Sequence, residues 1–220
     1  ILEYYDNDMA IQVIGSDGEA LDDLYFGFEL EVGDTVKTNS SNAEIRISNN
    51  GSILKLARNT TFTISNIQGV GGSPVTEFTI ISGKLRTIAA RTGTGDQQYL
   101  VNTPAAVCGV RGTDFTVDVQ PGNVNSLIVK SGLVEFIDRA TGRSLSLGAG
   151  MFADTFAAVF EAVQLTAEQL AEYLEEMDFT TLDPNQVPGQ TPQTVVEEPD
   201  TTEEPDTIDT TPVAPPVLPT

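Results

Sequence analysis

The sequence predicts an all-β domain, either a β-sandwich or a short β-roll or solenoid-like domain, followed by one short α-helix and a disordered acidic tail. Three observations predict this class: short bursts of alternating apolar and polar residues up to residue 147, a capped helical pattern at 165–177, and a composition rich in Pro, Thr and acidic residues from Leu182 onward. We therefore divide the chain into an all-β domain at 1–150, an extension with an amphipathic helix at 151–181, and a disordered tail at 182–220.

Nine segments alternate as half-buried strands do, and turn residues such as Gly, Asn and Pro separate them. They are 43–47, 53–56, 61–65, 77–81, 84–88, 114–119, 126–130, 133–137 and 144–147. Two junctions carry the same Ser-Gly pair, in IISGKLRTI (80–88) and IVKSGLVEFI (128–137), where we expect a tight hairpin or a bulge. Two copies are too few to establish a repeat.

The segment LTAEQLAEYLEEM (165–177) has the pattern of an amphipathic helix. Thr166 is suited to be the N-cap, with Gln169 three residues later, and Leu165 can pack on Leu170 as a hydrophobic staple. One apolar stripe follows the helix: Leu170, Tyr173, Leu174 and Met177. Such a stripe usually packs on its own chain. We therefore expect the helix to dock on the β-domain, with a partner-binding helix as the alternative.

Charge is distributed unevenly along the 220 residues. The formal net charge is −21, and all 11 Lys and Arg residues lie between Lys37 and Arg143. An acidic chain repels phosphate, so we expect no nucleic acid partner, and no stretch is apolar for long enough to insert in a membrane. The tail from Leu182 is too polar and too charged to order itself, so we expect a solvated terminus or a spacer. Because the chain opens at Ile1, we expect that an upstream signal peptide was removed.

The residue types argue against an enzyme and against a cofactor or metal. Histidine is absent, which removes the commonest catalytic base and metal ligand. The single cysteine, Cys108, lies among apolar residues, where we expect a buried and unreactive thiol. Acidic residues cluster in DND (6–8) and SDGEALDD (16–23), but neither follows the order of an EF-hand. A solvated loop is therefore favoured over a calcium site.

The segment VNTPAAVCGVRGTDFTVDV (101–119) combines a proline, two glycines, the cysteine and an arginine before an alternating strand. Pro104 ends ladder pairing and holds the residue before it extended. Gly109 and Gly112 permit backbone angles that are closed to other residues. Arg111 stands beside apolar residues, so if it is buried it must find a carboxylate or several carbonyls. We expect a crossover between two sheets that this arginine pins.

The same segment resembles the signature of the FecR domain family, in which a Thr-Pro pair is followed by a Val-Arg-Gly-Thr-x-Phe strand entry. The Gly-Asp, Thr and alternating strand of 32–64, the Ser-Gly turn of IISGKLR, and the closing VKSGLVEFI and LSLGAG are similar to the family in the same order. The resemblance covers about Met9 to Gly150. It implies structural or interaction roles for the motif residues, which are Thr103, Pro104, Gly109, Arg111, Gly112, Thr113 and Phe115.

Family members are all-β extracytoplasmic modules, and the best-known ones relay the state of an outer-membrane transporter to an anti-sigma segment inside the cell. The resemblance therefore implies a non-enzymatic binding or signal-relay module in the periplasm or at the cell surface, with an unidentified envelope protein or cell-wall polymer as its partner. No recognisable anti-sigma region is present, so sigma-factor regulation stays open. Two alternatives also stay open: a carbohydrate- or peptidoglycan-binding domain, and a calcium-stabilised surface or adhesion module.

Overall fold

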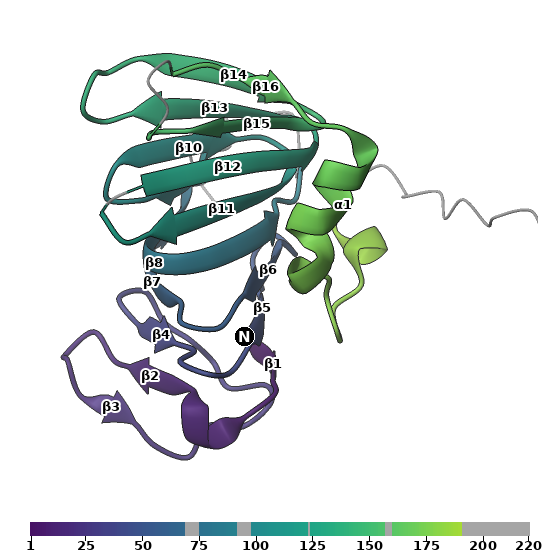
Figure 1. Ribbon diagram of the computed structural model, residues 1–220. Helices are drawn as coiled ribbons and strands as arrows, with labels where there is room; N and C mark the ends of the chain where they lie inside the picture. Colours follow the sequence, from purple (N-terminus) through teal and green to yellow (C-terminus); the bar gives the residue numbers. More distant parts are fainter. Residues whose placement is uncertain (69–74, 92–97, 123, 157–159, 191–220) are drawn as a thin grey trace, which may run out of the picture.

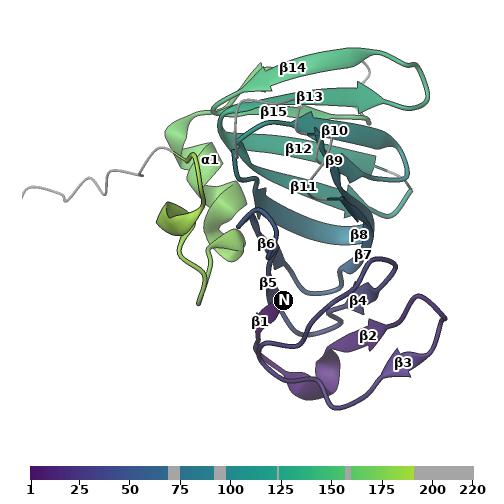
Figure 2. The same ribbon diagram turned by 180° about the vertical axis from the view of Figure 1, so that it is seen from behind.

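The computed structural model describes residues 1–68, 75–91, 98–122, 124–156 and 160–190, and these residues confirm the all-β class. The strands form two layers that share one long strand, β8 (Val75–Ile88) (Figures 1 and 2). Across layer A the order is β1 (Leu2–Tyr5), β5 (Ala43–Arg46), β6 (Ile53–Leu56), β8, β11 (Asp114–Gln120), β12 (Val124–Ser131), β15 (Met151–Asp154) and β16 (Val163–Gln164). Across layer B it is β3 (Ala20–Leu21), β2 (Gln12–Ile14), β4 (Thr35–Lys37), β7 (Thr61–Gln68), β8, β9 (Gln98–Asn102), β10 (Ala106–Val110), β13 (Leu133–Asp138) and β14 (Ser144–Gly148).

Strand β8 joins the layers because it bends at its Ser-Gly pair. Before the bend β8 pairs with β7 and β9 in layer B, and after it with β6 and β11 in layer A. Gly83 at the bend has φ +90°, and a Cβ there would lie 2.5 Å from the Cα of Thr60. Only glycine fits both the conformation and the close approach. The predicted strands 77–81 and 84–88 are thus two halves of one strand. The junction is a corner rather than a hairpin, and the register shift beside it, where Ser82 and Ile80 pair with the consecutive Thr61 and Phe62, agrees with the predicted bulge.

The second Ser-Gly pair makes an equivalent corner between β12 and β13. Gly132 also has φ +90°, and a Cβ there would lie 2.8 Å from the hydroxyl oxygen of Thr113. The Thr113 hydroxyl donates to the Leu133 carbonyl (2.9 Å) and accepts from the Leu133 N–H (3.3 Å). At the first corner the Thr60 hydroxyl makes the same two bonds to the residue after the glycine, Lys84, at 3.2 and 3.1 Å.

These corners belong to an internal repeat that the structure makes visible. RNTTFTI (58–64) and RGTDFTV (111–117) lead into the equivalent strands β7 and β11. Asn59 and Gly112 before the threonines have φ +57° and +62°, and both motifs bury their phenylalanine completely. The two Ser-Gly pairs that are too few to establish a repeat in sequence are therefore parts of a structural duplication.

The hydrophobic core fills the space between the layers. Its side chains come from the inward positions of each strand, as the alternating pattern requires. Aromatic rings form its centre: Phe78 lies 5.2 Å from Phe62 and 5.6 Å, edge to face, from Tyr99. The Tyr99 and Thr87 hydroxyls share a hydrogen bond, so the buried phenol keeps a polar partner.

The predicted helix is confirmed and docks on layer A. Helix α1 (Ala167–Leu174) begins with a complete capping box between Thr166 and Gln169, and the 3₁₀ turn η2 (Glu175–Met177) follows it. Leu174 and Met177 are buried, and Tyr173 stacks on Phe152 of β15 with ring centroids 5.9 Å apart. The docked interpretation of the apolar stripe is therefore correct. Two further 3₁₀ turns are η1 (Asp8–Ala10) and η3 (Pro184–Gln186).

The predicted start of disorder at Leu182 is wrong. Leu182 and Val187 are buried in a second, small apolar cluster with Ile53, Ile88 and Ala90 on the outer face of layer A. Leu182 and Val187 stand in a polar stretch of sequence, and nothing local to that stretch indicates that they pack on residues of layer A. The remainder of the predicted tail, 191–220, lies outside the described residues. The sheet also continues past residue 150, because β15 pairs with β12.

Candidate functional site

The first part of the family motif forms the tight turn between β9 and β10. The Thr103 hydroxyl accepts from the Ala106 N–H at 2.7 Å, and the Thr103 N–H donates to the Ala106 carbonyl at 3.0 Å. Pro104 is exposed at the tip of the turn, as expected for the residue that ends ladder pairing. Gly109 lies within β10, paired with Leu100 and Glu135 on either side.

The second part of the motif forms the corner where β10 leads into β11. Gly112 has φ +62°, and a Cβ there would lie 2.9 Å from the Cβ of Arg91. Thr113 and Phe115 are completely buried. The Thr113 hydroxyl is hydrogen-bonded to the main chain of Leu133, and Phe115 lies in the central core. The expected crossover between sheets is therefore present, held by a glycine, a threonine hydroxyl and an aromatic side chain.

Arg111 does not pin this crossover as a buried charge, because its side chain is exposed. The buried arginine is Arg86 in β8, whose side chain is 1% exposed. Apolar residues flank Arg111 in the sequence, but β10 ends at Val110 and the Arg111 side chain is exposed. Arg111 is therefore not a buried charge, and its role at the crossover stays a prediction.

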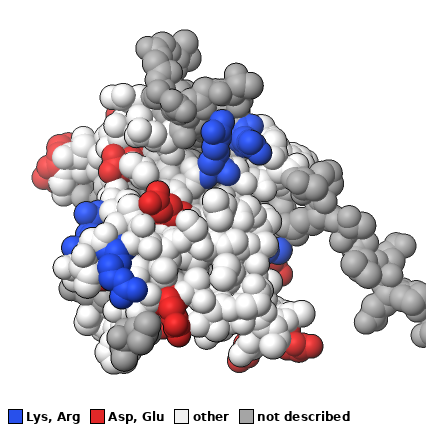
Figure 3. All heavy atoms as spheres, turned by 90° about the horizontal axis from the view of Figure 1, so that it is seen from above, with Lys and Arg blue, Asp and Glu red and all other residues white. Residues whose placement is uncertain are grey.

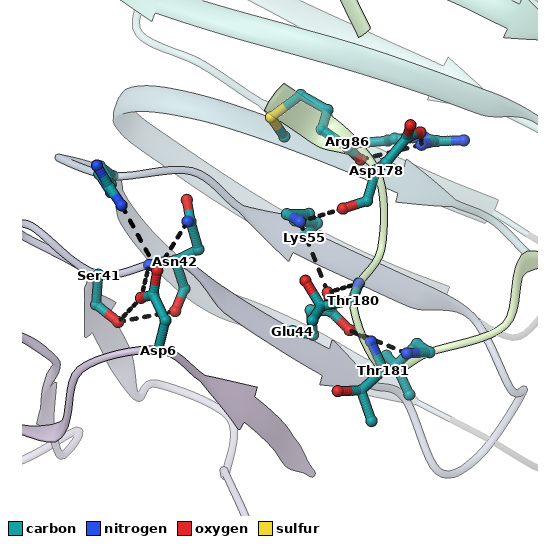
Figure 4. Close-up of polar contacts among 12 residues, drawn as sticks. Asp6, Ser41, Asn42, Glu44, Lys55, Arg86, Asp178, Thr180 and Thr181 are labelled. Carbon is teal, nitrogen blue, oxygen red and sulfur yellow. Dashed lines mark hydrogen bonds and ion pairs between the residues drawn. The ribbon is translucent and has the colours of Figure 1, made fainter. Parts of the chain in front are cut away.

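The candidate reactive groups from the sequence are held in structural contacts. Cys108 is fully buried in the core, and this burial raises the pKa of its thiol. Burial alone would raise the pKa of Asp6, but hydrogen bonds from Ser41 and Asn42 outweigh it, so this pKa is lowered (Figure 4). Among the described residues no group of three or more His, Cys, Asp or Glu side chains is placed to hold a metal ion. The same part of the chain contains no helix of the length and apolarity needed to cross a membrane.

A polar row that the sequence analysis missed crosses the outer face of layer A. Four residues are direct neighbours on successive strands: Glu44 on β5, Lys55 on β6, Arg86 on β8 and Thr116 on β11. All four are buried, and the first three are charged. The alternation of AEIRI, ILKL and KLRTI does indicate that these positions point away from the core. It gives no sign that another segment covers them.

Arg86 is the centre of this row. Its guanidinium donates to both oxygens of Asp114 at 2.9 and 2.8 Å, and its third nitrogen donates to the Met177 carbonyl (3.0 Å) and the Asp178 carboxylate (3.1 Å). Burial alone would lower the pKa of Arg86, but the hydrogen bonds and charge of Asp114 outweigh it and raise this pKa. A bidentate pair of this kind fixes orientation as well as charge.

Residues 175–190, which we call the C-terminal strap, cover the row (Figure 4). Glu44 accepts three backbone N–H groups from the strap, those of Thr180, Thr181 (2.9 Å) and Leu182 (3.0 Å). The Lys55 ammonium donates to the Asp178 carbonyl and lies 3.7 Å from Glu44. Side chains of layer A thus bind the main chain of the strap, and the charges of Glu44, Lys55 and Arg86 are paired and buried.

Next to the row, helix α1 and the strand ends border a groove that the strap leaves open. Two connected hollows of about 480 and 210 Å³ share Lys84 and Asp118 in their linings. Helix α1 contributes Tyr173 to the lining of the smaller hollow, and η2 contributes Glu176 to the lining of the larger one. The walls of this outer groove therefore come from both the β-domain and the C-terminal extension.

An aromatic cluster lies near the N-terminus. The Phe26 ring stacks on Tyr4 (6.0 Å) and meets Tyr5 edge to face (4.8 Å), and Tyr25 meets Phe28 at 5.7 Å. Tyr25 and Phe26 are 59% and 60% exposed.

On the face shown in Figure 3, Lys and Arg side chains are few and are interspersed with Asp and Glu rather than gathered in a basic patch.

Comparisons with known proteins agree with the fold. Crystal structures of a "putative anti-sigma factor" from Parabacteroides distasonis match with a TM-score of 0.51 and 15% identity. The match covers 64% of this chain and 64% or 63% of the solved chains, so this chain spans less than two thirds of their length. The search of curated proteins gave no match.

A family model matches the central part of the sequence, which supplies strands of both layers. The family model described as FecR protein matches residues 34–135, from the residue before β4 into β13. This range contains both copies of the internal repeat and the whole motif from Thr103 to Phe115. The strap and helix α1 lie outside it. Residues 34–135 therefore match the FecR family model, which confirms the resemblance to the FecR domain family for this part of the chain.

Proposed function

We propose that this chain is a non-enzymatic, extracytoplasmic signal-relay module that acts by binding another protein at the cell envelope. The FecR domain at 34–135 carries the proposal, because the domains of this family are regulatory and extracytoplasmic. The anti-sigma description of the similar solved structures supports a regulatory role as well. In this proposal the chain changes its partner's state by binding and performs no chemical step.

The roles of the motif residues follow from their burial. Thr103, Thr113 and Phe115 are buried and hold the turn and the corner, so we assign them to the fold. Pro104 and Arg111 are the motif residues whose side chains are exposed. The partner surface is then formed by side chains outside the buried motif, on a scaffold that the motif makes rigid.

A second candidate function, binding of carbohydrate or peptidoglycan, is favoured by one observation. Tyr25 and Phe26 present exposed rings beside the partly exposed Tyr4, and aromatic rings provide stacking surfaces for sugars. The calcium-stabilised alternative has less support, because Asp6 is already bound to Ser41 and Asn42.

Cross-linking in intact cells of the source organism tests the proposal. The tagged full-length protein is expressed from its own locus, treated in the cells with a short amine-reactive cross-linker, and its adducts are identified by mass spectrometry. We expect one dominant adduct with an envelope protein. In parallel, the purified chain is sedimented with insoluble peptidoglycan. Retention by the polymer without a protein adduct would contradict the proposal and favour the second candidate.

A further inference from the structure

The outer groove combines a charged floor with an apolar wall. Its floor is a second row of cross-strand neighbours beside the row that the strap covers. The row consists, strand by strand, of Lys84 on β8, Asp118 on β11, Ser126 on β12 and Asp154 on β15. The wall at the β15 end is apolar and partly exposed, and consists of Ile128, Phe152, Phe156 and Tyr173. Phe156 is 78% exposed, which is unusual for an aromatic ring without a partner surface.

Two polar groups at the groove lack partners within the described residues. The Thr116 side chain lines the groove, is only 2% exposed, and its hydroxyl makes no hydrogen bond there. A buried hydroxyl without a partner is costly, so such groups are usually satisfied by a ligand or water. The Lys84 ammonium takes part in none of the ion pairs of the described chain, although Asp118 is its cross-strand neighbour.

The strap shows what kind of molecule this face accepts. In the neighbouring row, Glu44 holds three main-chain N–H groups, while Lys55 and Arg86 each hold a main-chain carbonyl. The strap residues that supply these groups, 177–182, cross the strands rather than extending the sheet. Layer A thus recognises a polypeptide through side chains that bind its backbone. The groove row lies two residues further along β8 and β11, about 7 Å away, and it also combines a basic group with acidic ones.

We propose that the outer groove binds an extended segment of a partner protein, which lies beside helix α1 and parallel to the strap. Its backbone is bound by Thr116 and Asp118, an apolar side chain packs against Phe152, Phe156 and Tyr173, and a carboxylate pairs with Lys84. Strands β8 and β15 are three strand spacings apart, about 14 Å, which is about four residues of an extended peptide. The proposal rests on the proposed function, since it names the surface that the protein partner uses.

Synthetic peptides and the full-length chain test this site. The probes are blocked nonapeptides of Gly, Ser and Thr that carry one Leu and, four residues away in either order, one Asp. Binding is followed by backbone amide shifts in NMR spectra. We expect saturable shifts in residues 84, 116–118, 126–128 and 152–154. Lys84→Glu should weaken binding about tenfold, and a probe with Lys in place of Asp should recover it, because the charge pair is then reversed.

Two variants separate the site from the fold. Thr116→Val removes the unpartnered hydroxyl at nearly constant volume, so it should weaken peptide binding without lowering the melting temperature. Lys37→Glu makes the same charge change on β4 in layer B, outside the groove lining, and should leave peptide binding unchanged.

Each remaining outcome decides the matter. Shifts scattered over the surface, or groove shifts that Lys84→Glu leaves intact, overturn the proposal. Groove shifts caused by soluble peptidoglycan fragments but by none of the peptides overturn it in favour of a sugar site. If no peptide binds the groove while the envelope-protein adduct persists in Lys84→Glu cells, the site is wrong and the proposed function stands. If the adduct is also absent in wild-type cells, both fail.

Discussion

The Arg86 guanidinium and the Asp114 carboxylate form two parallel hydrogen bonds, 2.9 and 2.8 Å long, with both side chains 1% exposed. Asp114 belongs to the second motif strand of the FecR domain, whereas Arg86 also binds Met177 and Asp178 of the strap. One side chain therefore connects the family domain to the segment that covers it. The domain and the strap form one stable unit, with the outer groove open beside it.

Breaking this pair should destabilise the protein strongly. Arg86→Met leaves the buried Asp114 without its partner and should lower the free energy of unfolding by about 3–5 kcal/mol, measured by urea denaturation. Arg111→Ala is the matched control, because this arginine is exposed and should cost less than about 1 kcal/mol. The double variant Arg86→Met/Asp114→Leu should recover part of the loss. Equal stabilities for Arg86→Met and Arg111→Ala would contradict this assignment.

The two corner glycines should be equally intolerant of a side chain. Gly83→Ala and Gly132→Ala each introduce a Cβ at φ +90° within 2.9 Å of neighbouring atoms, so each should lower the free energy of unfolding by about 2 kcal/mol or more. Gly142→Ala is the control, since Gly142 has φ +69° but no atom within 4 Å of an added Cβ. It should cost only the strain of a positive φ. A similar loss at all three positions would mean that close approach does not define the corners.

Glu44 should control attachment of the strap. Glu44→Gln removes the charge that accepts three N–H groups and faces Lys55, so stability should fall by about 1–3 kcal/mol. Amide hydrogen exchange at residues 180–182 should become faster. In the control variant Glu3→Gln, which affects only the partly exposed pair with Arg46, both quantities should change little. Unchanged exchange at 180–182 in Glu44→Gln would show that apolar contacts alone hold the strap.

Asp138 should contribute to acid sensitivity. The hydrogen bond from the Thr141 hydroxyl (2.5 Å), with that from the Ala140 N–H (3.0 Å), holds the pKa of Asp138 below its usual range. Because the folded pKa is lower than the unfolded one, this stabilisation is complete above the ordinary aspartate pKa and is lost as the pH falls through the folded value. Thr141→Val should therefore raise the pKa of Asp138 in a carboxyl NMR titration. A titration curve identical to the wild type would refute the assignment.

Much of the fold can be predicted from the sequence because its signals are local. Alternation identified β5–β8 and β11–β14, and the Thr166 capping box identified the start of helix α1. The shorter or irregular strands β1–β4, β9, β10, β15 and β16 were not predicted. Both depend only on residues a few positions apart. The corners at Gly83 and Gly132 were harder to predict, because a Ser-Gly pair is equally compatible with a hairpin and with a bend between two layers. Only the pairing partners on either side distinguish them.

The candidate site could not be predicted because it depends on distant contacts. Glu44, Arg86 and Leu182 lie far apart in sequence, and each occupies a position that is normally exposed in such a pattern. The strap makes them buried. Arg111 is the converse case: its apolar neighbour Val110 is buried, whereas the Arg111 side chain is exposed. Local patterning identifies which face of a strand a residue occupies, but not what covers that face.

Site-specific photo-cross-linking in intact cells tests the central claim, that this module relays a signal by binding a protein in the outer groove. A photoreactive phenylalanine analogue is placed at Phe156 in the groove or, as the control, at Phe26 in the exposed aromatic cluster. We predict one protein adduct from position 156, its loss in Lys84→Glu, and no equivalent adduct from position 26. An adduct that forms from position 26 and is absent from position 156 would contradict the account.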